Sequence, residues 1–138
     1  GTLLYKRKNT DMTVDTTLTE AQSGGLFNFK GSGLTASLPQ STAANEGICY
    51  TFSNGVLAAT ANLFITASSG GQIVGSINAE GAGAEGAYAG LGTAIYGLKG
   101  SLSAIGDQIE ITSMGGVWVI TNADVSGSTW EVKAAGAV

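Results

Sequence analysis

The sequence predicts an all-β domain, a jelly-roll or β-sandwich built from about eight to ten short antiparallel strands. Two observations predict this class. Apolar and polar residues alternate with a period of two in many short stretches, and no period of 3.6 residues is sustained over a helical length. Turn-forming residues, among them several glycine pairs and Asn54-Gly55, separate these stretches, where a positive φ angle is needed.

Each predicted strand is an alternating stretch bounded by turn residues. In chain order the predicted strands are Met12–Leu18, Leu26–Lys30, Leu34–Leu38, Ile48–Ser53, Asn62–Ala67, Gln72–Ile77, Thr93–Leu98, Gln108–Thr112, Val117–Thr121 and Trp130–Lys133. Two further stretches are each expected to form one helical turn. Thr17–Glu20 match a capping box that Gly24 would end, and Pro39–Asn45 would turn before Glu46.

The composition indicates one domain with an unusually bland surface. The chain has 138 residues, of which 43% are hydrophobic and only 12% are charged. Ordinary soluble domains carry about twice that charged fraction. We therefore expect one β domain over residues 12–138, preceded by an arm over residues 1–11, with part of the surface covered by other copies or by a partner. No apolar run is long enough to cross a bilayer, and the N-terminus lacks a signal-peptide core, so we expect a soluble protein with no membrane partner.

The residue types exclude most familiar catalytic sites. Histidine is absent and Cys49 is the single cysteine, which rules out a Ser-His-Asp triad, a Cys-His dyad, a His or Cys zinc site and an internal disulfide. Glu80 with Glu85 and Asp107 with Glu110 are the nearest carboxylate pairs; the latter two would point to opposite faces of a strand. We expect no enzyme activity, no cofactor and no metal.

The cations are concentrated at the N-terminus. Lys6, Arg7 and Lys8 form a basic run, whereas residues 9–138 hold three cations and ten acids. An acidic body repels phosphates, so a nucleic-acid partner is not expected. Two interpretations of the basic run stay open: a solvated arm, or an arm that binds an acidic patch on a neighbouring subunit.

The aromatic residues divide between core and interface. Tyr50 and Phe52 alternate with small residues, and Trp118 alternates with valines, so all three are expected in the core. Trp130 fits either a core or an interface position. The Gly- and Ala-rich segment Gly75–Gly92 is read as an exposed or interface loop, or as a place of close backbone approach.

Three segments together resemble a β-rich module that recurs in bacteriophage virion proteins, particularly tail fibres and head decoration proteins. They are SGLTASLPQSTAANEGICYTFSNG (Ser32–Gly55), NLFITASSGGQIVGSI (Asn62–Ile77) and the strand pair that includes Met114–Ile120. The resemblance extends over about Thr17–Thr121. It implies an architectural part that self-associates, often as a trimer, and it brings no catalytic residues.

The resemblance and the composition together predict a phage structural protein, most simply a capsid decoration or cement protein. It would assemble with itself, expected as a trimer, and bind the major capsid protein or another virion protein through Lys6, Arg7 and Lys8. Such a protein would reside in the virion, assembled in the host cytoplasm. Trp130, Tyr88 and Tyr96 are candidate interface residues.

Two alternatives remain. One is a tail fibre or tailspike component. The other is a glycan-binding adhesion module, in which loops 69–71 and 78–92 would hold a sugar against Tyr88 or Tyr96.

Overall fold

The structure, a computed structural model, describes residues 8–31, 33–55, 63–67, 71–75, 79–80, 94–97, 106–126 and 130–133. This part of the chain is all-β, as predicted, and contains two 3-10 turns. The elements are β1 (Asn9–Met12), β2 (Thr16–Thr17), η1 (Glu20–Gln22), β3 (Leu26–Phe29), β4 (Thr35–Ser37), η2 (Ala43–Asn45), β5 (Cys49–Asn54), β6 (Leu63–Thr66), β7 (Ile73–Val74), β8 (Ala79–Glu80), β9 (Ala94–Gly97), β10 (Gln108–Ser113), β11 (Trp118–Ser126) and β12 (Trp130–Lys133). Neither turn approaches the length and apolarity of a membrane-spanning helix, and the described residues hold no other helix.

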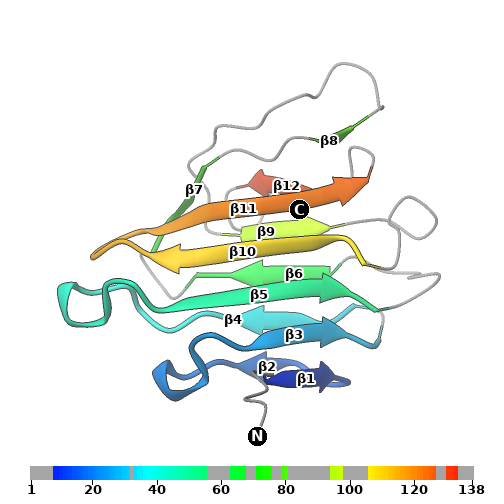
Figure 1. Cartoon of the computed structure of the whole chain (residues 1–138), viewed down its shortest axis with the longest axis horizontal. Helices are drawn as coiled ribbons and strands as arrows, with labels where there is room; N and C mark the ends of the chain where they lie inside the picture. Colours follow the sequence, from blue (N-terminus) through cyan, green and yellow to red (C-terminus); the bar gives the residue numbers. More distant parts are fainter. Residues whose placement is uncertain are drawn as a thin grey trace, which may run out of the picture.

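The strands form two sheets that face each other (Figure 1). One has the order β1-β3-β5-β10-β11-β7, with β8 pairing beside β11, and the other has the order β12-β9-β6-β4-β2. Successive strands from β1 to β6 alternate between the two sheets. Within each sheet their neighbours run parallel: β1 with β3 and β3 with β5 in one, β2 with β4 and β4 with β6 in the other. The N-terminal half is therefore a coil of stacked rungs, each contributing one strand to each sheet.

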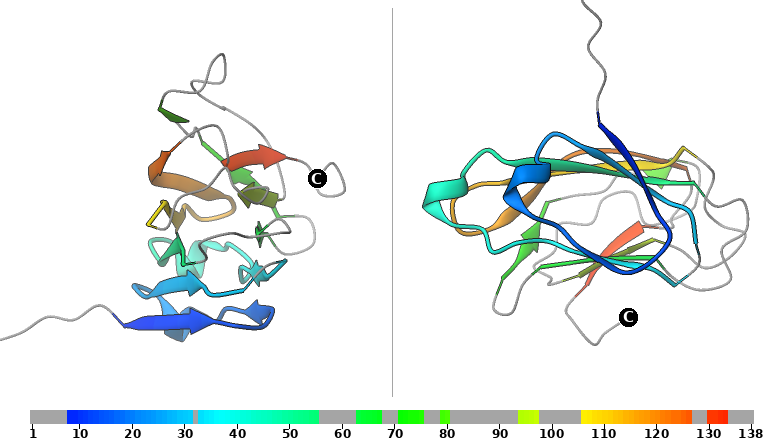
Figure 2. Two further views of the ribbon diagram at one scale, coloured as in Figure 1. Left: turned by 90° about the vertical axis from the view of Figure 1, so that its right-hand side faces the viewer. Right: turned by 90° about the horizontal axis from the view of Figure 1, so that it is seen from below.

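In the C-terminal half both sheets continue with antiparallel strands, except that β7 and β8 pair parallel with β11. β10 pairs antiparallel with β5, and β11 with β10, while β9 pairs antiparallel with β6, and β12 with β9. Seen from the end of the stack where β1 and β2 lie, the two sheets form two layers (Figure 2). The turn η1 connects β2 to β3 and the turn η2 connects β4 to β5, and both lie on the same side of the stack.

The predicted jelly-roll or β-sandwich of antiparallel strands is not confirmed. Six of the ten pairings among the described strands are parallel. Alternation along a strand reports which face is buried, not the direction of the neighbouring strand, so the sequence pattern fitted either arrangement.

All ten predicted strands overlap an observed strand, and three differences remain. The predicted strand Met12–Leu18 is wrong as one element, because β1 ends at Met12 and the chain crosses to the other sheet before β2. β1 also takes in residues 9–11, so the expected arm boundary between residues 11 and 12 falls inside a strand. β8 was not predicted.

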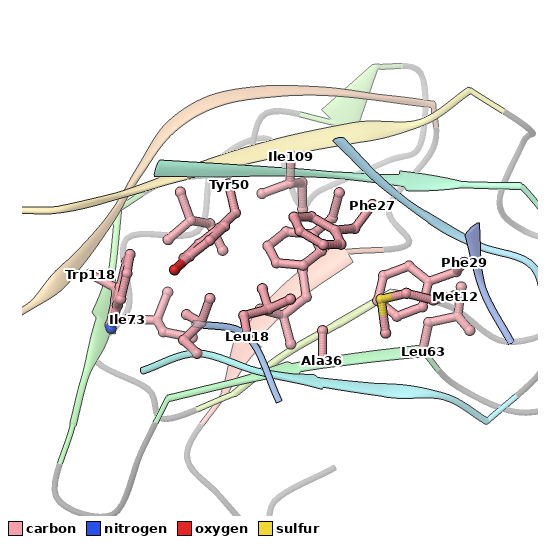
Figure 3. Packing of buried hydrophobic residues seen from close by; sticks show 14 of the residues in the cluster. Met12, Leu18, Phe27, Phe29, Ala36, Tyr50, Leu63, Ile73, Ile109 and Trp118 are labelled. Carbon is pink, nitrogen blue, oxygen red and sulfur yellow. The ribbon is translucent and has the colours of Figure 1, made fainter. Parts of the chain in front are cut away.

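The core lies between the two sheets and is rich in aromatic rings (Figure 3). Phe27 and Phe29 of β3 lie beside Tyr50 and Phe52 of β5, with ring centroids about 6 Å apart, and all four are buried. Trp118 extends the row, with its ring 5.8 Å from that of Tyr50. The core positions predicted for Tyr50, Phe52 and Trp118 are confirmed. Aromatic pairs of this kind add about 0.5 to 1.5 kcal/mol each beyond the burial of their surface.

The two 3-10 turns share one sequence pattern. It reads T-x-x-Q-x-G-x-x-F-x-F from Thr19 and T-x-x-N-x-G-x-x-Y-x-F from Thr42. In each turn the threonine N–H donates to the side-chain amide oxygen three residues later, Gln22 Oε1 or Asn45 Oδ1, both at 2.8 Å. This contact satisfies a donor that the start of a helical turn leaves free.

A glycine ends each turn with a positive φ angle, 85° at Gly24 and 94° at Gly47. Residues with a side chain rarely adopt this conformation. The glycine N–H then donates to the next strand of the seven-stranded sheet, from Gly24 to the Cys49 carbonyl and from Gly47 to the Ser113 carbonyl, both at 2.8 Å. Each corner is thus tied to the strand stacked beside it.

Asn45 is a buried node of this corner region. Its Oδ1 accepts hydrogen bonds from the Thr42 N–H and from Ser113 Oγ at 2.8 and 2.9 Å. Its Nδ2 donates to the Gln40 carbonyl at 2.7 Å and to Glu20 Oε1 at 3.1 Å. Every donor and acceptor of the amide is used, and the contacts join both corners to β10.

Replacement of Asn45 by alanine is expected to lower the free energy of unfolding by about 3 kcal/mol, because buried partners lose their hydrogen bonds. Gln22→Ala removes the equivalent contact at the more exposed corner and is expected to cost about 1 kcal/mol. Urea unfolding of the two variants measures the difference. Equal losses would contradict the role of Asn45 as the node.

Candidate interaction surface

The described residues contain no group of His, Cys, Asp or Glu side chains able to hold a metal ion. Of the carboxylates that the sequence singled out, Asp107 is buried immediately before β10 and Glu110 is half-buried on the outer face of the same strand. Thr121 Oγ1 donates to Glu110 Oε1 at 2.8 Å. Glu80 lies in β8, and Glu85 lies outside the described residues. The described geometry therefore does not bring Asp107 and Glu110 together into a site.

Most of the predicted interface residues fall outside what the structure describes in side-chain detail. Lys6, Arg7 and Tyr88 lie outside the described residues. Tyr96 lies in β9, where it is paired with Phe64 and Glu131, and Trp130 begins β12 opposite Gly97. The loops predicted for glycan binding are represented by Gly71 and β8 alone. These interface assignments stay predictions.

Lys8 is the described residue of the basic run. Its side chain is exposed at the entry to β1, and its carbonyl oxygen accepts a hydrogen bond from the Leu26 N–H at 2.8 Å. The backbone of Lys8 is thus already bonded to the sheet.

The outer face of the seven-stranded sheet carries a row of polar side chains. Asp11, Asn28, Ser53 and Gln108 lie side by side across four strands. Asn28 is the centre of a hydrogen-bonded group: its Nδ2 donates to Asn9 Oδ1 at 2.9 Å and to Asp11 Oδ1 at 3.4 Å, and its Oδ1 accepts from Ser53 Oγ. This row binds the first three strands of the sheet to one another across their outer face.

The centre of this face is closed. Thr51 and Ser53 are 4% and 3% exposed although they point away from the core. They are small, and Thr51 is paired with the larger residues Leu26 and Glu110 on the two neighbouring strands. The Thr51 hydroxyl has no hydrogen-bond partner among the described atoms. The small side chains at this centre are therefore enclosed by their neighbours.

The edge of the sheet at β1 is open, since no described strand pairs with its outer side. The Leu26 and Lys30 N–H groups donate to the carbonyls of Lys8 and Met12. In a parallel ladder this pattern turns Lys8, Thr10 and Met12 toward β3, and it turns the backbone groups of Asn9 and Asp11 away from it. Unpaired strand edges of this kind are templates for pairing with another chain. The β1 edge, defined as the outer side of Asn9–Met12, is the candidate interaction surface.

Within the part of the chain that the structure describes, Tyr50 has a raised pKa. Burial, reinforced by the nearby charges of Glu20 and Cys49, raises the pKa of Tyr50 from 10.0 to about 12. The phenol is therefore protonated at neutral pH and donates to the Thr19 carbonyl at 2.7 Å. The hydroxyl joins β5 to the first corner, and its role is structural.

Comparison of this chain with protein-family models, with curated proteins and with solved structures finds no match. Function is therefore inferred from the geometry and from the sequence resemblance described above.

The raised pKa of Tyr50 predicts a pH dependence of stability. Because the neutral phenol is favoured in the folded state, its contribution is complete below pH 10 and is lost as the pH rises toward 12. The free energy of unfolding of the wild-type protein should therefore fall more steeply over this range than that of Tyr50→Phe. Urea unfolding at several pH values measures both slopes, and parallel slopes would contradict the assignment.

Proposed function

We propose that this chain is a structural module of a bacteriophage virion that works by self-association, with capsid decoration as its role. The observation that carries the proposal is the open β1 edge, at the end of a stack whose rungs are held together by the hydrogen bonds of Asn28 and Asn45. A stack of this kind offers extended, repetitive surfaces and edges, which suit assembly better than binding of a small molecule.

The proposed location in a phage virion rests on the sequence resemblance to phage β modules. The segment that carries most of it, SGLTASLPQSTAANEGICYTFSNG, contains β4, the second corner and β5. Within this segment Tyr50 and Phe52 pack in the core and Asn45 forms the corner hydrogen bonds, which suits a building block. Catalysis is not part of the proposal, and a trimer is the proposed unit of assembly.

The proposed partner surface on the capsid is acidic and is bound by the basic run of the N-terminus. The double variant Lys6→Glu with Arg7→Glu reverses the charge ahead of β1 and leaves the Lys8 carbonyl in place. It is expected to fold and assemble as the wild type does but to bind phage heads at least about tenfold more weakly, through loss of attraction to acidic groups.

Light scattering together with sedimentation on heads stripped of minor proteins measures both properties. A mass of three times 13.7 kDa with saturable binding supports the decoration role. A protein that ignores heads and binds tails or a cell-surface glycan would overturn it, in favour of a fibre component or an adhesion module. Unchanged head binding by the double variant would remove the basic run from the mechanism.

A further inference from the structure

We infer that the β1 edge pairs with the β1 edge of a second copy of this chain, as an antiparallel ladder across a two-fold axis at Thr10. The inference rests on the proposed self-association and names the surface that carries it. A two-fold contact doubles the mass of the unit it joins, whether that is a single chain or the proposed trimer.

The backbone of β1 limits the possible registers. Asn9 and Asp11 present their N–H and carbonyl groups to the open side, so a hydrogen-bonded antiparallel pair must set these residues opposite each other. An axis at Thr10 sets Asn9 of each copy opposite Asp11 of the other. Two such pairs exchange four backbone hydrogen bonds and use both residues of β1 whose backbone faces the open side.

The side chains of Asn9 and Asp11 are complementary in this register. Both lie on the outer face of the sheet, where they share Asn28 Nδ2 as a donor through their Oδ1 atoms. The remaining polar groups are Nδ2 of Asn9, which is a donor, and Oδ2 of Asp11, which is an acceptor. Across the two-fold axis each donor meets an acceptor, and cross-strand pairs of this kind are close enough to bond.

The register with its axis at Asp11 is disfavoured by charge. An axis at Asp11 would set two carboxylates directly opposite each other, and like charges in that position are destabilising. An axis at Asn9 would pair half of β1 with residues that precede Lys8. On the inner side, the axis at Thr10 brings together two threonines, a favourable cross-strand pair.

The test changes charge while it keeps, within each chain, an oxygen at residues 9 and 11 that accepts from Asn28 Nδ2. Asn9→Asp retains an oxygen that accepts from Asn28 but places two carboxylates opposite each other in the dimer. The double variant Asn9→Asp with Asp11→Asn restores a donor opposite an acceptor. Asp11→Asn alone is the neutral control, since two amides can still bond.

Analytical ultracentrifugation over a dilution series measures the dissociation constant of the two-fold contact. The expected result is about a tenfold increase for Asn9→Asp and a return close to the wild-type value for the double variant and for Asp11→Asn. Circular dichroism and urea unfolding of the dilute proteins check that each variant is folded.

The outcomes separate the inference from the proposed function. An assembly whose dissociation constant is the same for all four proteins would overturn the β1 contact while leaving self-association intact. A wild-type protein that stays a single 13.7 kDa chain at every concentration would overturn both. Loss of assembly in Asn9→Asp that the double variant fails to restore would also overturn the proposed pairing.

Discussion

The structure depends on the corner that carries the chain from one sheet to the other. A strand buries its apolar side chains only if a facing layer covers them, and here that layer is supplied by the next strand along the chain. The corners make this possible in a few residues, because Gln22 and Asn45 satisfy the N–H of the threonine that starts each turn. The glycine that follows bonds to the neighbouring strand. Short corners are what keep the rungs parallel and stacked.

The two corners are equivalent in sequence but not in burial, and this difference shapes the core. The β3–β5 register sets Phe27 beside Phe52 rather than beside Tyr50, which its sequence position matches. The second corner is thus displaced outward along the strand. Tyr50 gains room to pack against the tilted ring of Trp118 and to donate a hydrogen bond to the first corner. Asn45 is enclosed between Glu20 and Ser113. The hydrogen bonds of Asn45 and the packing of the aromatic row therefore each hold the other in position.

Alternation in the sequence was enough to predict the all-β class, most strand positions and the core positions of Tyr50, Phe52 and Trp118. It was not enough to predict parallel pairing, because the same period serves both strand directions. Alternation also did not predict the burial of Thr51 and Ser53, since small polar residues on a central strand can be enclosed by their neighbours. The repeated T-x-x-[Q/N]-x-G pattern is a sequence signal for stacked rungs, because an internal repeat indicates a repeated structural unit. The β1 edge has no signal in composition, because it depends on which side of one strand is left unpaired.

Hydrogen exchange of the four β1 amides tests both the edge contact between copies and the pairing of β1 with β3. Within one chain, Thr10 and Met12 face β3 and are protected, whereas Asn9 and Asp11 face outward. If β1 pairs with β1 of a second copy, all four amides exchange slowly at high protein concentration. Asn9 and Asp11 alone lose this protection on dilution. Fast exchange of Asn9 and Asp11 at every concentration would contradict the edge contact, and fast exchange of Thr10 and Met12 would contradict the parallel stacking of β1 on β3.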